Sequence, residues 1–279
     1  MSAVLNTNMA SLYAQKNLST AQADLASSVQ KLSSGKRINS AKDDAAGFAV
    51  AEAVKATKNV TDQSIQNVQD AISLTQTAEG ALDVVSKILQ RTLTLVTEKQ
   101  DTSLTGDAST GQKGSINAEI ATLLSEVKSI SDRTKFQGGP TPGSIFTSNT
   151  ATFASGDGVN TTLTVGTLTL AGLGITPATE GAVTQGQADA ITSTQIMSAV
   201  QTNIASRATL GATQNRLNYI VDNMQTLSNN LADAQSRIVD TNYAAETANL
   251  TRGQILQQAA TSMLAQANQM PNVILTLLK

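Results

Sequence analysis

The chain has 279 residues and a formal net charge of −2, and 40% of its residues are hydrophobic although only 3% are aromatic. An interior built from Ala, Leu, Ile and Val suits slender helix-on-helix packing better than a bulky compact core. The near-neutral charge, without a dense Lys/Arg patch, argues against nucleic-acid and membrane-surface partners. The absence of cysteine excludes disulfides and thiolate metal sites.

The sequence has neither a signal-peptide pattern at its start nor a membrane-span pattern elsewhere. The first fifteen residues lack the basic and apolar regions of a signal peptide. Nowhere do about 18 apolar residues follow one another. We therefore expect a chain that is not cleaved by signal peptidase and does not span a membrane.

The first arm of the chain, up to Gly35, has apolar residues three and four positions apart, which line one face of a helix. Lys31 in the last turn and Gly35 after it predict where this helix ends. Ser40 followed by Asp43 resembles a capping box, so a second helix should begin there. The apolar positions of the first helix are Leu5, Met9, Leu12, Leu18, Leu25, Val29 and Leu32.

The next segment predicts two further helices. From Ile65 to Val96 the apolar positions keep a seven-residue register, interrupted by Thr75, Glu79 and Ser86, which is typical of a coiled coil. After a Gly-rich bend at 106–114, the apolar residues from 116 to 130 predict a third helix. We expect Ser115 to cap it and the helix to end near Phe136.

The middle of the chain, residues 136–186, differs in composition from both flanks. Ten of the 18 glycines and three of the four prolines lie between Gly138 and Gly186. The β-branched run from Thr161 to Leu170, with Gly-Asp-Gly at 156–158 as a turn signal, predicts a small β-hairpin.

The second arm starts near Asp189 and has the most regular register in the chain. Its seam positions are Leu217, Ile220, Met224, Leu227, Leu231, Ala234 and Ile238, followed by Leu256, Ala259, Met263, Ala267, Met270, Ile274 and Leu277, with Pro271 as an interruption. Both chain ends are therefore predicted to be amphipathic helices, and arms from opposite ends can pair only by bringing the termini together. Head-to-tail contacts between copies that do not close into a ring would give a helical filament.

We predict a mainly α fold: a long coiled-coil helical bundle with paired N- and C-terminal helices and a small β-hairpin element in the middle insert. The expected division is 1–42 plus 239–279 for the terminal helices, 43–135 plus 187–238 for a helical domain, and 136–186 for the insert. A continuous apolar stripe points to a partner surface. The predicted self-assembly residues are Leu5, Leu12, Leu18, Leu25, Leu32, Leu256, Met263, Ile274 and Leu277.

Catalytic chemistry has little support in the sequence. There is no His or Cys, and no nucleophile-elbow, phosphate-binding or dinucleotide-binding motif. The Gly-Asp-Gly near 157 lacks the oxygen ligands of a calcium loop. Asp43 and Asp44 point about 100° apart on a helix, so they do not converge on a substrate. Helix capping is therefore a better interpretation of them than acid–base catalysis. We predict no enzyme, no cofactor and no metal.

Two long segments resemble one family. The stretch LSSGKRINSAKDDAAGFAVAEAV, Leu32 to Val54, resembles the hallmark segment of bacterial flagellins, as does the opening Leu5-Asn6-Thr7-Asn8. Residues Asp240 to Lys279 are similar to the flagellin carboxyl terminus over their whole length. The resemblance implies a structural subunit that self-polymerises into the flagellar filament for motility, and export to the cell exterior by the flagellar type III system. It also implies terminal helices that line the filament channel and are disordered in the free monomer.

The resemblance further implies several partners. These are copies of the same chain, a flagellar export chaperone at the C-terminal helix, and the filament cap and hook-junction proteins. Flagellins are also ligands of an animal Toll-like receptor, through a helix segment that Gln90, Arg91, Leu95 and Val96 resemble and an acid that matches Glu119. Leu93 and Thr94 replace charged residues of strongly sensed members. Without a receptor, Arg91 and Glu119 are interpreted as a solvated charge pair.

Three other classes of protein share some of these features, and the sequence fits each of them less well. A hook-associated junction protein shares the terminal helices but does not polymerise indefinitely. A chemoreceptor-like signalling bundle is also rich in Ala, Gln and heptads, but it would need a membrane span. A type III translocator would need a long apolar hairpin.

Overall fold

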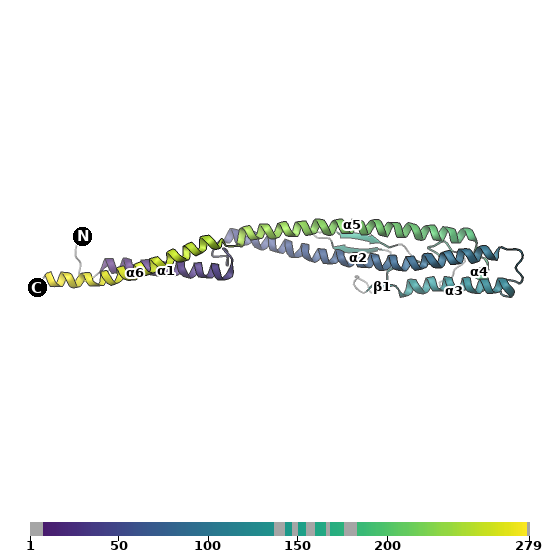
Figure 1. Ribbon diagram of the computed structural model, residues 1–279, viewed down its shortest axis with the longest axis horizontal. Coiled ribbons are helices and arrows are strands. Elements are labelled where there is room, and N and C mark those ends of the chain that lie inside the picture. Colours follow the sequence, from purple (N-terminus) through teal and green to yellow (C-terminus); the bar gives the residue numbers. More distant parts are fainter. Residues whose placement is uncertain are drawn as a thin grey trace. The chain divides into compact units, whose positions relative to one another are not determined.

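The computed structural model describes residues 8–136, 143–146, 150–154, 160–165, 168–175 and 183–277. These ranges contain six helices and four short strands (Figure 1). The helices are α1 (Met9–Ser34), α2 (Ala45–Lys99), α3 (Gly111–Arg133), α4 (Gln185–Asp189), α5 (Ser193–Val239) and α6 (Tyr243–Leu277). The strands are β1 (Lys135–Phe136), β2 (Gly143–Ser144), β3 (Thr150–Ala154) and β4 (Asn160–Thr164). The predicted mainly α fold is confirmed.

The chain divides into two compact units, residues 1–58 with 229–279, and residues 59–228. Both boundaries fall inside helices, in α2 and in α5. The predicted boundaries at 42 and 239 instead follow the breaks between helices, and the three-part division remains a prediction.

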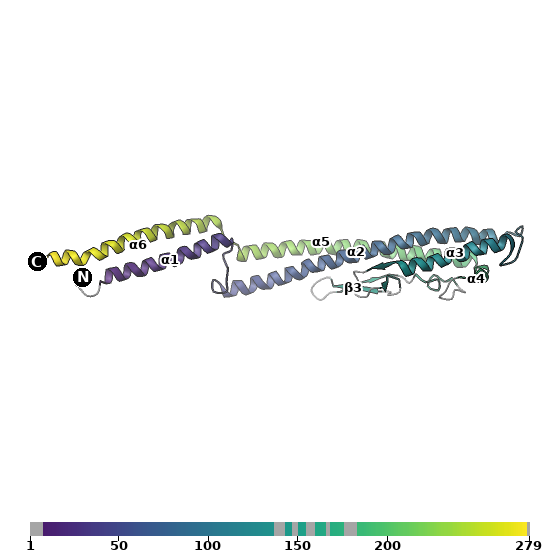
Figure 2. The same ribbon diagram turned by 90° about the horizontal axis from the view of Figure 1, so that it is seen from below.

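In the first unit, segments from the two ends of the chain meet where α1 ends and α6 begins (Figure 2). Gly35 follows the last residue of α1 with φ of 69°, the left-handed conformation that the sequence predicted for this position. The backbone N–H of Arg37 donates to the carbonyl of Val239 at 2.6 Å, and that of Thr241 donates to the carbonyl of Gly35 at 3.0 Å.

The start of α2 differs from the prediction. The Asp43 carboxylate accepts hydrogen bonds from the backbone N–H groups of Asn39 and Ser40, at 3.0 and 2.9 Å, so it closes a turn ahead of the helix. These backbone hydrogen bonds hold the pKa of Asp43 below its ordinary value. The helix itself begins at Ala45, and Asp44 caps it by accepting from the N–H of Gly47 at 2.9 Å. The predicted capping box of Ser40 and Asp43 was therefore wrong.

The start of α3 also differs. The helix begins at Gly111, four residues before Ser115, and the Ser115 hydroxyl donates back to the Gly111 carbonyl at 3.2 Å. Ser115 is therefore an interior residue of the helix and not its cap. At the other end α3 stops at Arg133, because Lys135 and Phe136 pair with β2 as a short antiparallel strand.

The predicted hairpin is present as β3 paired antiparallel with β4, from Thr150 opposite Thr164 to Ala154 opposite Asn160. The second strand is shorter than the β-branched run suggested, since residues 169–174 form turns. The expected turn at 156–158 lies outside the described residues.

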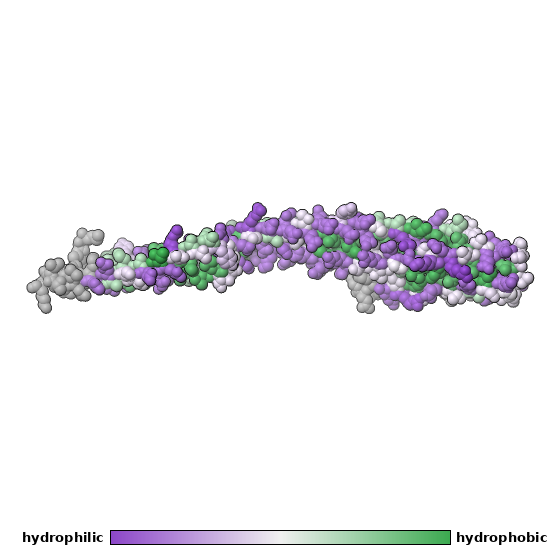
Figure 3. Space-filling model, in the orientation of Figure 1, coloured by the Kyte–Doolittle hydropathy of each residue, from purple (hydrophilic) through white to green (hydrophobic). Residues whose placement is uncertain are grey.

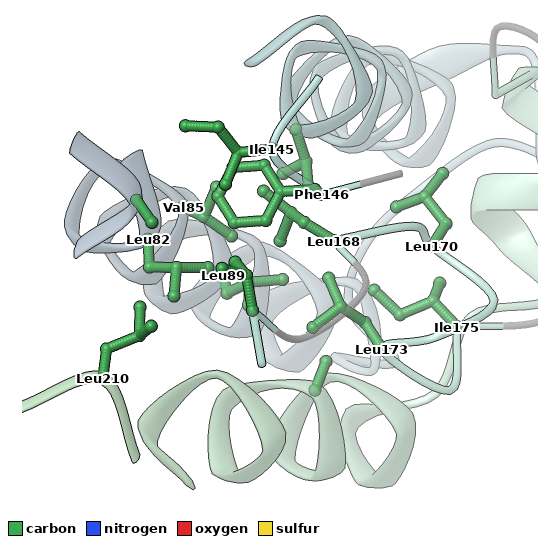
Figure 4. Close-up of a cluster of buried hydrophobic side chains, with 14 of the residues drawn as sticks. Leu82, Val85, Leu89, Ile145, Phe146, Leu168, Leu170, Leu173, Ile175 and Leu210 are labelled. Carbon is green, nitrogen blue, oxygen red and sulfur yellow. The ribbon is translucent and has the colours of Figure 1, made fainter. Parts of the chain in front are cut away.

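The core of the second unit is an apolar cluster shared by α2, α3, α5 and the insert. Figure 4 shows Leu82, Val85 and Leu89 of α2 beside Phe146, which is fully buried. Other insert side chains complete this part of the cluster, and they are Ile145, Leu168, Leu170, Leu173 and Ile175. The insert thus contributes to the core of the unit.

Candidate self-assembly surface

Helices α1 and α6 pack side by side, so the predicted pairing of the two chain ends is confirmed (Figure 2). Asn8 caps α1 and also reaches α6, since its Oδ1 accepts from the N–H of Ser11 at 3.1 Å while its Nδ2 donates to the carbonyl of Ala267 at 2.7 Å. Further along, Gly253 is buried against α1. A Cβ atom built on it would lie 3.6 Å from Cβ of Leu25, so the glycine permits a close approach of the two helices.

The buried face of this helix pair is made of small residues. In α1 the buried positions are Ala14, Ala21 and Ser28, which are seven residues apart. On α6 they are Gly253 and Ala267. Ala267 was predicted as a seam position, whereas Gly253 and the small residues of α1 were not, although small residues repeating every seven positions are themselves a recognisable signal.

The large apolar side chains of the pair lie mostly outside this seam. Leu12, Leu256 and Met263 are 59%, 52% and 62% exposed. Leu18, Leu25 and Leu32 are half-buried. Leu5 lies outside the described residues, and Ile274 and Leu277 belong to the last turns of α6. Exposed apolar residues of the pair that the sequence analysis did not single out are Tyr13, Tyr243 and Ile255.

A groove of about 900 Å³ runs between α1 and α6. Alanines of both helices line it, together with Tyr13, Leu256 and Met263. Small side chains leave room in such a groove, and large apolar side chains at its border favour an apolar occupant. Figure 3 shows hydrophobic residues at the surface over these helices.

The residues matched to a receptor contact occupy two different environments in the second unit. Gln90, Arg91 and Glu119 are exposed, and Arg91 donates from Nε and Nη2 to Oε1 of Glu119 at 3.0 and 2.9 Å. Leu95 is only 2% exposed, and the adjacent Val96 is fully buried. The expected contact through Leu95 therefore needs correction, since its side chain belongs to the core and is not presented to a partner.

Within the ranges that the structure describes, no group of three or more His, Cys, Asp or Glu could hold a metal ion. Among the helices described, none is long and apolar enough to cross a membrane.

Comparison with known proteins identifies two matching family models. Residues 5–140 match the bacterial flagellin N-terminal helical region, and residues 193–278 match the bacterial flagellin C-terminal helical region. Similar curated proteins cover almost the whole chain. The flagellin of Halalkalibacterium halodurans is 37% identical over 99% of this chain and 100% of its own length. The flagellin of Bacillus subtilis is 36% identical over 99% of both chains. The flagellar filament 33 kDa core protein of Treponema phagedenis is 32% identical over 99% of this chain and all of its own.

Proposed function

Because this chain belongs to the bacterial flagellin family, it is a structural subunit of the bacterial flagellar filament, and we propose that copies assemble through the helix pair α1–α6. The observation that carries this proposal is the placement of large apolar residues. The two arms are already paired through small residues, while Leu12, Leu256 and Met263 remain more than half exposed. An exposed apolar surface of this kind favours association.

The groove between α1 and α6 supports the proposal, because it offers a receiving surface on the same helix pair that carries the exposed residues. In this proposal, Leu12, which is exposed and does not line the groove, enters the groove of the next copy, where Leu256 and Met263 receive it. Such a contact joins two different patches, so it is head-to-tail and can continue into a helical filament.

Membership of the family also supports proposals on export and on further partners. The chain is exported by the flagellar type III system to the cell exterior. Its further partners are an export chaperone that binds α6, the filament cap and the hook-junction proteins. A host Toll-like receptor is proposed to contact the exposed side chains Gln90, Arg91 and Glu119, with Leu95 acting only through the packing of α2.

Seeded elongation tests the assembly proposal. Purified monomer is mixed with short filament fragments, and filament length is followed by electron microscopy. We expect elongation that consumes the monomer. Monomer that keeps its helical circular dichroism signal but does not extend the seeds would contradict the proposal and favour a junction protein, which none of the comparisons favours.

A further inference from the structure

The chain contains six methionines and no cysteine, so methionine supplies all of its side-chain sulfur. Peroxides oxidise such sulfur atoms more readily where solvent reaches them. Among the methionines whose side chains the structure describes, Met263 is the most exposed at 62%, followed by Met197 at 52% and Met9 at 50%. Met224 is only 7% exposed. An oxidant in solution therefore reaches Met263, Met197 and Met9, whereas the core protects Met224.

Met263 differs from the other two accessible methionines in its place on the molecule. It lies on α6 and lines the groove between α1 and α6, whereas Met9 and Met197 do not line this groove. The groove residues one turn away from Met263 on the same face of α6 include Ala259, Ala260 and Ala267. The Met263 thioether thus borders a part of the groove that is made mainly of methyl groups.

Hydrogen peroxide converts a methionine thioether to a sulfoxide. A lone pair of the sulfur attacks one peroxide oxygen, so that an S–O bond forms as the O–O bond breaks. The departing hydroxide takes the proton of the transferred oxygen and leaves as water. The sulfur loses two electrons and the peroxide gains them. A flexible apolar side chain thereby becomes a polar one that accepts hydrogen bonds.

We propose that Met263 is an oxidation-sensitive position that decides whether a copy joins the filament, an inference that rests on the proposed assembly through α1 and α6. As a thioether, Met263 receives the apolar Leu12 of the next copy. As a sulfoxide, it would bury a polar oxygen against Leu12, which has no hydrogen-bond donor in its side chain. A polar group that is buried without a hydrogen bond weakens association. Gln266 also lines the groove, and its amide is a donor that offsets part of this cost.

The proposal makes the effect of oxidation specific to one position and reversible. Sulfoxides at Met9 and Met197 form on exposed surface outside the groove, so they leave the contact with Leu12 unchanged. Methionine sulfoxide reductases return the sulfoxide to the thioether. In that reduction a dithiol supplies the two electrons and becomes a disulfide, and the oxygen leaves as water.

A competition within the unsubstituted full chain tests the proposal. Monomer is treated with hydrogen peroxide so lightly that most oxidised chains carry a single sulfoxide, and it is then mixed with filament seeds. Sedimentation separates filaments from free monomer, and peptide mass spectrometry gives the sulfoxide fraction at each methionine. We expect the Met263 sulfoxide to be depleted about tenfold in the filaments. The sulfoxides of Met9 and Met197 should be equally abundant in both fractions, and equal depletion at all three positions would overturn the proposal.

Substitutions provide a second test, in which each chain is compared with itself before and after full oxidation. The rate of seeded elongation should fall about tenfold in the wild type and in the control Met9→Leu, and reductase with a dithiol should restore it. In Met263→Leu the rate should not fall, whatever its starting value, because leucine has no sulfur. An equal fall in Met263→Leu would overturn the proposal.

The two tests separate this inference from the proposed function. Unoxidised monomer that does not extend the seeds would contradict assembly through α1 and α6, and the role of Met263 would fall with it. If unoxidised and oxidised monomer extend the seeds equally well, the chain assembles and only the role of Met263 is contradicted. The competition needs no substitution, so it decides the matter even if Met263→Leu folds poorly.

Discussion

The hydroxyl of Tyr243 lies over Gly35, 2.9 Å from the position that a Cβ atom on this glycine would occupy. Gly35 also has φ of 69°, where an L residue is disfavoured by about 1–2 kcal/mol. Gly35→Ala should therefore destabilise the junction between α1 and α6 by about 1–2 kcal/mol and displace Tyr243. Circular dichroism melting of assembled filaments measures the effect. A variant whose filaments melt at the wild-type temperature would contradict it.

Two other glycines give the opposite expectation. A Cβ atom on Gly80 or Gly211 would meet nothing within 4 Å, and both residues lie inside helices, in α2 and α5. Alanine at either position should stabilise the protein by about 0.5–1 kcal/mol, because glycine loses more backbone entropy on folding. Urea unfolding measures this change. A loss of stability would show that the space beside these glycines is not open.

The helix ends show what could be predicted from the sequence and what could not. Gly35 was identified as the end of α1 because a left-handed glycine after a basic last turn has few alternatives. The start of α2 was misassigned because Ser40, Asp43 and Asp44 can all accept or donate hydrogen bonds, and local spacing does not decide among them. Three-dimensional geometry assigns Asp43 to the turn and Asp44 to the cap.

The candidate receptor contacts show a second limit of prediction from the sequence. The seam of α2 was predicted from its seven-residue spacing, whereas Leu95 lies off that predicted seam and was matched to a receptor contact by resemblance alone. It is buried because α2 packs against more than one element, including the insert, whose apolar residues join the same core. The apolar spacing of one helix predicts the face that it buries against a partner helix. It does not predict that an irregular segment elsewhere in the chain packs on another face.

The turn that precedes α2 should respond to acid. Because backbone N–H groups bind the ionised Asp43 carboxylate, its folded-state pKa lies below the unfolded value of about 3.9. Its stabilising contribution is present above the unfolded pKa and is lost as the pH falls through the folded pKa. Asp43→Asn should remove this dependence, as measured by urea unfolding across that pH range. An NMR titration that gives Asp43 an ordinary pKa would contradict the assignment.

Lys99 should hold the end of α4, which follows the insert, against α2. Its ammonium donates to the carbonyls of Ala188 and Asp189 at 3.0 and 2.7 Å, and the side chain is only 10% exposed. Lys99→Met keeps the apolar stem but removes the donors, so unfolding free energy should fall by roughly 1.5–3 kcal/mol. Lys87→Met is the control, because Lys87 is 73% exposed and its ion pair with Asp83 contributes little to the free energy of unfolding. Equal effects of the two substitutions would contradict the role of Lys99.

The exposed apolar residues of the terminal pair should control assembly more than the folding of the chain. Leu12, Leu256 and Met263 are already half in contact within one copy, so each has about half of its burial energy left to gain, roughly 1–1.5 kcal/mol. Each substitution to Ser should therefore raise the critical concentration for filament growth about tenfold. Sedimentation of seeded reactions measures this concentration.

Gln22→Ser is the matched control for these substitutions, since Gln22 is an exposed polar residue of α1 and its replacement removes little apolar surface. The circular dichroism of each monomer should match the wild type, which separates a loss of assembly from a loss of folding. If the three apolar variants polymerise at the wild-type concentration, the copies must associate through another surface. If Gln22→Ser impairs growth as strongly, apolar burial is not the cause.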